Sequence, residues 1–308
     1  MSPPSYIRLQ PFSFSILPDH PSLTRMPTRP PLRDFLHDIL TQAQSFVSAI
    51  PTTFHPTRKP RRSPPAAAPV LLSTYSRPEA CSGTSTKKSK QQQQQQQQQQ
   101  RGSEFWICRT SVHENAARDG TASSAEFRAG LRENHSAHEM EYTPSVTAVE
   151  TLLQWPSQPA IEGGWQRVDI HVNAITHTFH PRLLIAPRTF IVLVVSADQP
   201  SNQSGFVTVQ IPLSLTAEPA ETLPDLLCAV TAAQPPNAIL AAYASVEQVS
   251  FTPPETDTDV VTWTMATTSD AGGAIPSWVQ RSWTLGGAPK AVVADVGLFM
   301  RWVASNRS

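Results

Sequence analysis

The clearest alternation of apolar and polar residues lies at positions 165–179, WQRVDIHVNAITHTF. Every second position from Val168 to Ala174 is apolar, whereas the positions between them are polar. A period of two predicts a strand with one buried and one polar face, typical of an antiparallel sheet that covers a core on one side. We interpret the polar face, which includes His171, as exposed to solvent.

Further segments have the length and composition of strands. Residues 189–197 are apolar on both faces and predict a central strand, and residues 206–215 follow a turn and predict its hairpin partner. The remaining strand-like segments are 105–113, 142–155, 239–251 and 259–269. Because these segments lack the spacing of βαβ units, they exclude a doubly wound fold and predict an α+β domain.

Three regions have a helical pattern. Residues 32–50 space their apolar side chains by about three, four and seven positions, which predicts an amphipathic helix whose apolar face needs a partner. Residues 119–139 predict a turn followed by a helix with Thr121 or Ser123 as its N-cap. Residues 275–305 predict two helical pieces separated by a Gly-Gly-Ala-Pro break.

The first third of the chain is otherwise irregular. Residues 1–31 predict a mostly irregular leader. Residues 51–104 are rich in Pro, Arg, Ser and Ala and include ten consecutive glutamines, so they contain too little apolar area to offset the entropy of ordering. We therefore expect a disordered linker at 51–104 and one folded domain at 105–305.

Charge divides the chain near the same boundary. The net charge is zero, yet residues 1–101 contain 13 of the 24 Lys and Arg and only 4 of the 24 Asp and Glu. This basic tail can bind an anionic partner or simply keep the segment solvated. Cys81, Cys108 and Cys228 are odd in number and widely spaced, which favours a reducing compartment and argues against disulfides or a structural zinc site.

The sequence contains no apolar run of about 18 residues, so it predicts no transmembrane segment. The first residues also lack the apolar core of a secretory signal. We therefore expect a cytoplasmic protein. Nuclear targeting through the basic clusters at 58–62 and 87–90, and mitochondrial targeting, are the alternatives.

Motifs of catalysis and of cofactor binding are missing from the sequence, including a nucleophile elbow, a phosphate loop and a dinucleotide fingerprint. The cluster RENHSAHEMEY at 132–142 lacks the ligand order of zinc helices, so we interpret it as a helix terminus. His171, His177 and His180 share a strand face without an identifiable nucleophile. We predict no catalytic residue, no cofactor and no metal, and the acidic domain predicts no nucleic-acid partner.

Five motifs stand out: W-x-C-R-x-S-x-H (106–113), G-T-A-S-x-x-E-F (120–127), H-x-x-x-E-x-E-Y-T-P-x-V (135–146), D-x-G-G-x-I-P-x-W-V-Q (270–280) and D-V-x-x-F-x-x-W (295–302). Together they resemble a fungal family of START-like domains of unknown function. The resemblance implies a helix-grip fold, in which a curved antiparallel sheet wraps around a C-terminal helix and encloses an apolar cavity. It further implies a lipid or sterol-like ligand, transient contact with a membrane surface and no established catalytic residues. The polyglutamine insert and Ser124 depart from the family pattern.

We place the expected ligand pocket on the apolar strand faces and the first C-terminal helical piece. The candidates are Arg109, His113, Val168, Ile170, Val172, Val209, Ile211, Trp263, Met265 and Trp278. Arg109 and His113 alternate on one strand face and would orient the polar end of a ligand. The other interpretation is that the apolar residues pack directly on the helix and leave no cavity. Gly272 and Gly273 predict a turn that can serve as a hinge for the helix.

The first functional hypothesis is therefore the binding, and by extension the transfer, of a hydrophobic ligand. The alternative is a non-catalytic interaction scaffold that recruits partners through the basic, Gln-rich tail. An enzyme on a START-like scaffold is the third hypothesis, and it would require an acid–base pair inside the cavity.

Overall fold

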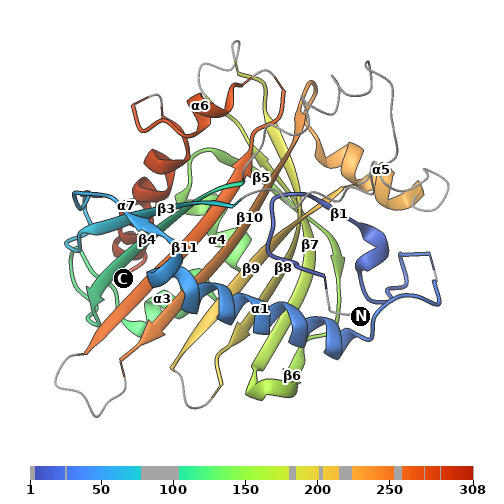
Figure 1. Cartoon of the computed structure of the whole chain (residues 1–308), viewed down its shortest axis with the longest axis horizontal. Coiled ribbons are helices and arrows are strands. Elements are labelled where there is room, and N and C mark those ends of the chain that lie inside the picture. The colour runs from blue at the N-terminus through green and yellow to red at the C-terminus, as the bar shows by residue number, and fades with distance from the viewer. Residues whose placement is uncertain are drawn as a thin grey trace.

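One large antiparallel sheet organises the computed structural model, which describes residues 4–24, 26–77, 104–179, 185–200, 204–214, 224–252, 259–273, 275–284 and 286–307 (Figure 1). The strands run in the spatial order β2-β3-β4-β11-β10-β9-β8-β7-β5, while β1 pairs with β9 and β6 pairs with β7. Their bounds are β1 Phe12–Ser13, β2 His55–Pro56, β3 Val70–Arg77, β4 Glu104–Glu114, β5 Val146–Gln154, β6 Gln158–Ala160, β7 Gln166–His177, β8 Arg188–Asp198, β9 Gly205–Ser214, β10 Ile239–Phe251 and β11 Val260–Asp270.

Helices cover both faces of this sheet (Figure 1). They are α1 Leu32–Thr53, α3 Ser124–Leu131, α4 His135–Tyr142, α5 Pro224–Ala233, α6 Ser277–Gln280 and α7 Ala288–Ser305, with short 3-10 turns η1 Phe14–Ile16 and η2 Glu162–Gly164. Helix α1 lies across β8, β9 and β10 on one face, whereas α7 packs on β3 and β4 and α4 packs on β5. We call the two sides the α1 face and the α7 face.

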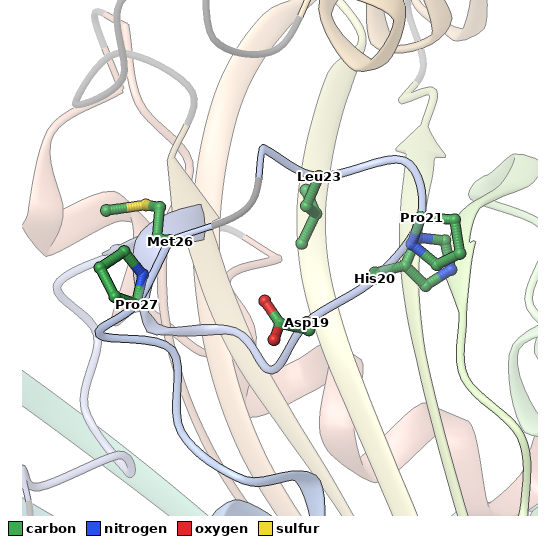
Figure 2. A pocket seen from close by; sticks show the side chains of 6 residues that line it. All are labelled: Asp19, His20, Pro21, Leu23, Met26 and Pro27. Atoms are coloured by element: carbon green, nitrogen blue, oxygen red, sulfur yellow. The ribbon is translucent and has the colours of Figure 1, made fainter.

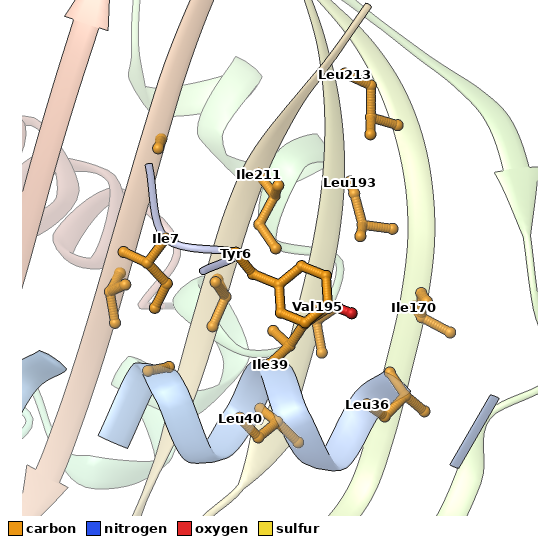
Figure 3. Packing of buried hydrophobic residues seen from close by; sticks show 14 of the residues in the cluster. Tyr6, Ile7, Leu36, Ile39, Leu40, Ile170, Leu193, Val195, Ile211 and Leu213 are labelled. Atoms are coloured by element: carbon orange, nitrogen blue, oxygen red, sulfur yellow. The ribbon is translucent and has the colours of Figure 1, made fainter. Parts of the chain in front are cut away.

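The α1 face contains the larger apolar core. Leu36, Ile39 and Leu40 of α1 pack with Tyr6 and Ile7 of the leader against apolar side chains of the central strands (Figure 3). The strand residues labelled in that view are Ile170, Leu193, Val195, Ile211 and Leu213. Because side chains alternate along a strand, the residues between these positions point to the α7 face. The apolar face predicted for residues 165–179 is therefore covered by α1 and the leader.

A second core holds α7 against the other end of the sheet. Phe127, Trp263 and Phe299 pack their rings together, with centroids between 5.2 and 5.7 Å apart. Helix α3 starts with a capping box in which Ser123 and Glu126 satisfy each other's backbone N–H groups. The Asp198 carboxylate of β8 accepts hydrogen bonds from Arg128 at 2.8 Å and from Arg132 at 3.2 Å, which fixes α3 over the sheet.

A strap at residues 61–67 crosses α7 from outside. The Gly297 N–H donates to Ser63 Oγ at 2.8 Å, and a Cβ at Gly297 would lie 2.5 Å from the Pro64 carbonyl oxygen. Only glycine allows this approach of the backbone to the helix. The strap therefore holds the middle of α7 in place.

Several sequence expectations need correction. Part of the predicted disordered linker is ordered, because Val70–Arg77 form β3 and pair with β4 along eight residues. The leader, which we predicted to be mostly irregular, contributes to the core, since Tyr6, Phe12 and Phe14 are buried. The single helix expected at 119–139 is divided, because Asn134 adopts a left-handed conformation (φ 47°) between α3 and α4. The glutamine tract lies outside the described residues.

Other expectations are confirmed. Every residue of β8 is buried, as predicted for a central strand, and α1 spans the predicted helix with three additional residues. The C-terminal tail forms α6 and α7 on either side of the Gly-Gly break.

Among the described residues, none of the helices combines the length and the apolar composition of a membrane span.

Replacement of Ile39 by alanine tests the role of α1 as the cover of the sheet. The Ile39 side chain is fully buried against the α1 face. We expect Ile39→Ala to lower the free energy of unfolding by about 2–5 kcal/mol, measured by urea denaturation of the full chain. Ser48→Ala on the exposed side of the same helix is the control and should change stability by less than about 0.5 kcal/mol. Equal stability of the two variants would show that α1 does not anchor the sheet.

Candidate functional site

A row of polar side chains crosses the α7 face of the sheet. The strand register places Arg109 opposite Met265, Met265 opposite Glu247, and Glu247 opposite Thr208, which faces Ser196 on β8. These positions alternate with the apolar residues that face α1. The polar face of β7, which we expected to be exposed to solvent, is covered in part by α4 and the α3–α4 junction. Asn173 is buried, His171 is half-buried and the Asp169 side chain is 39% exposed.

Two cavities lie along this row. A deep cavity of about 40 Å³ lies between the sheet, α4 and α7 and is lined by residues that include Arg109, Gln210, Glu247, Glu139, Tyr142 and Asp295. An open cavity of about 480 Å³ lies between the α3–α4 junction and strands β5, β7 and β8. Its lining includes Arg132, Asn134, Thr151, His171, Asn173 and Ser196. His135 lines both cavities.

Arg109 dominates the deep cavity. Its side chain is 1% exposed, donates from Nη2 to Glu247 Oε1 at 3.2 Å, and stacks its guanidinium 3.8 Å from the Trp263 ring centroid. Two other donors of the same group, Nε and Nη1, have no hydrogen-bond partner. Gln210 Nε2 also lacks a partner, although Ser245 Oγ donates to its Oε1 at 2.9 Å. Each unpaired buried donor costs about 1–3 kcal/mol, so an occupant that accepts these bonds would be stabilised.

Glu247 is the common acceptor of the site. Its Oε1 receives hydrogen bonds from Arg109 and from Trp263 Nε1, the latter at 2.7 Å, and its Oε2 lies 3.8 Å from His135 Nδ1. His135 is oriented by the Leu131 carbonyl oxygen, 3.0 Å from Nδ1. The ion pair thereby links β4 and β10 across β11 and connects both to the start of α4.

Two further carboxyl groups line the deep cavity. Burial raises the pKa of Asp295 to about 7, with Arg109 opposing the rise and the carboxylates of Glu139 and Glu247 adding to it. Burial also raises the pKa of Glu139, while His135 opposes that rise. Three acids therefore share one arginine, and the described residues contain no group of three or more ligands arranged to hold a metal ion.

His171 and His113 on the α7 face have lowered pKa values. Burial lowers the pKa of His171, in the open cavity, to about 4, with a further contribution from His135 and with Asp169 opposing. Burial and the charge of Arg109 lower the pKa of His113 to about 4. His113 lies 2.8 Å from Ser111 Oγ, its ring packs 5.4 Å from Phe127, and it lines neither cavity.

The structure brings some predicted pocket residues together and separates the others. Arg109, Trp263 and Met265 all line the deep cavity. The predicted pocket residues that lie on the α1 face, packed under α1 and the leader, are Val168, Ile170, Val172, Val209 and Ile211. The side chain of Trp278 lies outside the described residues.

The predicted hinge glycines lie in a turn after β11 and have a left-handed backbone conformation. Gly272 and Gly273 have φ angles of 62° and 63°. A Cβ at Gly272 would meet the Leu240 carbonyl oxygen at 2.9 Å, so the turn packs against the start of β10. These features explain the choice of glycine, and the hinge itself stays a prediction.

Sequence reasoning missed Glu247, Gln210, Glu139 and Asp295. Gln210 and Glu247 are polar interruptions in otherwise apolar strands, which is a readable signal of an enclosed polar site. Asp295 lies in a helix whose neighbouring Val292 and Val296 are buried, so its position near that apolar stripe was a second signal. Their convergence with Glu139 depends on long-range pairing that one sequence does not specify.

A larger pocket of about 670 Å³ lies on the other side of the molecule, in the leader (Figure 2). It is lined by Asp19, His20, Pro21, Leu23, Met26 and Pro27. Its polar groups have partners nearby, since Asp19 lies 3.7 Å from Arg29 and the His20 ring packs 4.9 Å from that of Trp155. With its polar groups engaged in the fold, this pocket is a weaker candidate than the two cavities of the α7 face.

Comparison with known proteins supports the fold. The model of a family described as a protein of unknown function (DUF3074) matches residues 106–303. Human STARD10 is 11% identical, with a TM-score of 0.50 and coverage of 93% of this chain and 88% of that chain. Human StAR-related lipid transfer protein 5 is 10% identical, with a TM-score of 0.53 and coverage of 90% and 100%. No curated protein matches by sequence. The predicted START-like helix-grip fold is thus confirmed.

The pKa of Asp295 makes a prediction about stability. An unfolded Asp titrates near 3.8 and the folded one near 7, so the folded protein holds an additional proton between these values. Stability from this group is therefore present at acidic pH and is lost as pH rises through 7. As the pH is raised from 5 to 8, we expect the free energy of unfolding of Asp295→Asn to increase relative to that of the wild type by on the order of 2 kcal/mol. Urea denaturation at both pH values measures the difference, and the buried histidines affect both proteins alike. Parallel pH profiles would show that Asp295 titrates normally.

Proposed function

Because the chain belongs to the DUF3074 family, which has no known function, we propose its function from the cavities of the α7 face. The protein binds a small amphipathic molecule between the sheet and helices α3, α4 and α7. The polar end of the ligand occupies the deep cavity beside Arg109 and extends into the polar-lined open cavity, and the apolar part lies toward the mouth of the open cavity. Binding requires no chemical step, and we propose no catalysis.

The observation that carries the proposal is the set of unpaired donors in the deep cavity. Arg109 and Gln210 are both at least 95% buried, and together they leave three N–H donor atoms without acceptors. In native protein interiors, buried N–H donors normally have hydrogen-bond acceptors. A cluster of unpaired donors beside a cavity therefore supports a binding site in which a ligand supplies the missing acceptors.

The size of the cavities and the fold support a ligand with an apolar part. The open cavity of about 480 Å³ falls within the range of about 300–1,000 Å³ typical of small-molecule sites. Human StAR-related lipid transfer protein 5, which shares the fold, is by name a lipid transfer protein. By analogy we propose a lipid-like ligand and its transfer from a membrane surface, with the protein acting in the cytoplasm.

The route into the cavity is proposed at the α3–α4 junction. The strap fixes α7 through Ser63 and Gly297, so α7 is poorly placed to lift. The open cavity instead reaches the surface beside Glu133 and Asn134, where Asn134 has a left-handed backbone. Local movement of this junction would admit a ligand without disturbing the strap.

The scaffold alternative depends on the basic, Gln-rich tail, of which residues 78–101, including the glutamine tract, lie outside the described residues. The ordered part of the N-terminal region, including α1 and β3, belongs to the cores of both sheet faces. Nothing in the described residues favours the scaffold over ligand binding.

Uptake of lipid from vesicles tests the proposal. The full chain is incubated with phosphatidylcholine–cholesterol vesicles, separated from them, and examined by native mass spectrometry and lipid extraction. We expect a bound molecule on the wild-type protein. The double variant Arg109→Leu with Glu247→Leu removes both charges of the pair together, so that Glu247 is not left without its partner, and we expect it to lose about tenfold or more in uptake. Far-UV circular dichroism checks that this variant is folded.

Thr264→Val on the α1 face serves as the matched control, because Thr264 faces away from both cavities and bonds to Thr110. This variant should take up lipid like the wild type. Absence of any bound or acquired molecule on the folded wild-type protein would contradict the proposed function.

A further inference from the structure

The deep cavity offers hydrogen-bond donors in a fixed arrangement. Arg109 is held by Glu247 and Trp263, and Gln210 is oriented by the bond that its Oε1 accepts from Ser245. With Oε1 occupied, the Gln210 amide presents its Nε2 as a donor. The cavity therefore contains three unpaired donor atoms, Arg109 Nε, Arg109 Nη1 and Gln210 Nε2, to which an occupant can supply an acceptor.

The same cavity offers carboxyl groups from three elements. Glu247 comes from β10, Glu139 from α4 and Asp295 from α7, and all three line the cavity with Arg109. The other titratable groups that line it are His135 and Tyr142. The charge of Arg109 is already paired with Glu247, and Glu139 and Asp295 add no positive charge, so a phosphate, sulfate or carboxylate would find no uncompensated cation in the cavity.

A hydroxyl group satisfies both sets at once. It accepts from Arg109 or Gln210 and donates to a carboxyl oxygen, whereas a fully ionised anion can only accept and a quaternary ammonium can neither accept nor donate. The deep cavity, at about 40 Å³, is close to the share of about 30 Å³ that one water molecule occupies in the liquid. It therefore accommodates one hydroxyl rather than a phosphate.

Partners for further hydroxyl groups continue into the open cavity. Ser196 and Thr208, 3.0 Å apart, connect the linings of the two cavities. Beyond them lie Asn173, His171 and Asp169, which combine donors and acceptors. An occupant with several hydroxyl groups would thus find partners along the whole path.

We propose that the site selects an uncharged, polyhydroxylated head group, such as a sugar or another polyol, over phosphate, carboxylate and quaternary ammonium head groups. The proposal rests on the ligand-binding function above and specifies the chemistry of the polar end. The three acids determine the selectivity against anions, and the donors of Arg109 and Gln210 determine the selectivity against cations.

A series of amphiphiles with the same octyl chain tests this selectivity. Octyl β-D-glucoside, octyl phosphate and octyltrimethylammonium are titrated into the full chain below their micelle concentrations, and binding is followed by calorimetry. We expect the glucoside to bind about tenfold or more tightly than either charged amphiphile, because each unmatched buried polar group reduces affinity by about this factor.

A matched pair of glutamine variants assigns the effect to the deep cavity. Gln210→Leu removes one donor from the cavity, whereas Gln248→Leu removes a glutamine that bonds to Ser250 on the other face of the sheet. We expect Gln210→Leu to weaken glucoside binding about tenfold and to leave octyl phosphate binding unchanged, while Gln248→Leu changes neither.

The outcomes separate the two proposals. Binding of all three amphiphiles with similar affinity, preference for a charged head group, or wild-type glucoside binding by Gln210→Leu would overturn the head-group inference and leave ligand binding intact. Failure of every octyl amphiphile to bind, together with failure of lipid uptake from vesicles, would overturn ligand binding itself.

Discussion

The buried ion pair between Arg109 and Glu247 is the interaction on which the interior of the α7 face depends. Placing two charges inside a protein costs several kcal/mol per ion, and their attraction compensates only when the geometry is good and other hydrogen bonds assist. Here the Trp263 ring supports the guanidinium and its indole N–H bonds to the carboxylate. The pair therefore holds β4, β11 and β10 in register around one polar centre.

The sheet separates this polar centre from the apolar core by the alternation of its strands. On β10, Val246 belongs to the core under α1, while the adjacent Glu247 faces the deep cavity. Helix α1 and the leader cover the α1 face, so that its apolar side chains are closely packed and shielded from solvent. The α7 face can then contain imperfectly packed polar groups, because most of the apolar burial that stabilises the fold occurs elsewhere.

The sequence predicted the strands well and their surroundings less well. Alternation in residues 165–179 revealed a strand with two unlike faces, and the apolar run at 189–197 revealed a central strand. Periodicity reports which residues share a face, but it does not report which helix covers that face. The polar side of β7, with His171, was therefore interpreted as exposed to solvent, although α4 and the α3–α4 junction cover it in part.

The missed parts of the site share a physical cause. Arg109 was a candidate from its place on a strand, yet its partner Glu247 is 138 residues away, and only the order of strands in the sheet brings them together. Strand β3 was missed although its sequence, VLLSTYSR, contains several residues that favour strands, because this short run follows a Pro-rich segment and does not indicate its distant partner. Pairing with β4 supplies the order.

The strap links these observations to the movement of ligands. Residues 61–67 were expected to be disordered, but Ser63 bonds to the backbone of α7 at Gly297 and the Pro64 carbonyl packs on the same glycine. A helix held in this way keeps Asp295, two residues before Gly297, in a fixed position in the deep cavity. In the proposed binding mode, the rigid part of the fold therefore positions the acid that contacts the head group, and the α3–α4 junction provides the movement. In this arrangement recognition and access depend on different elements, so a ligand can exchange while the polar centre keeps its geometry.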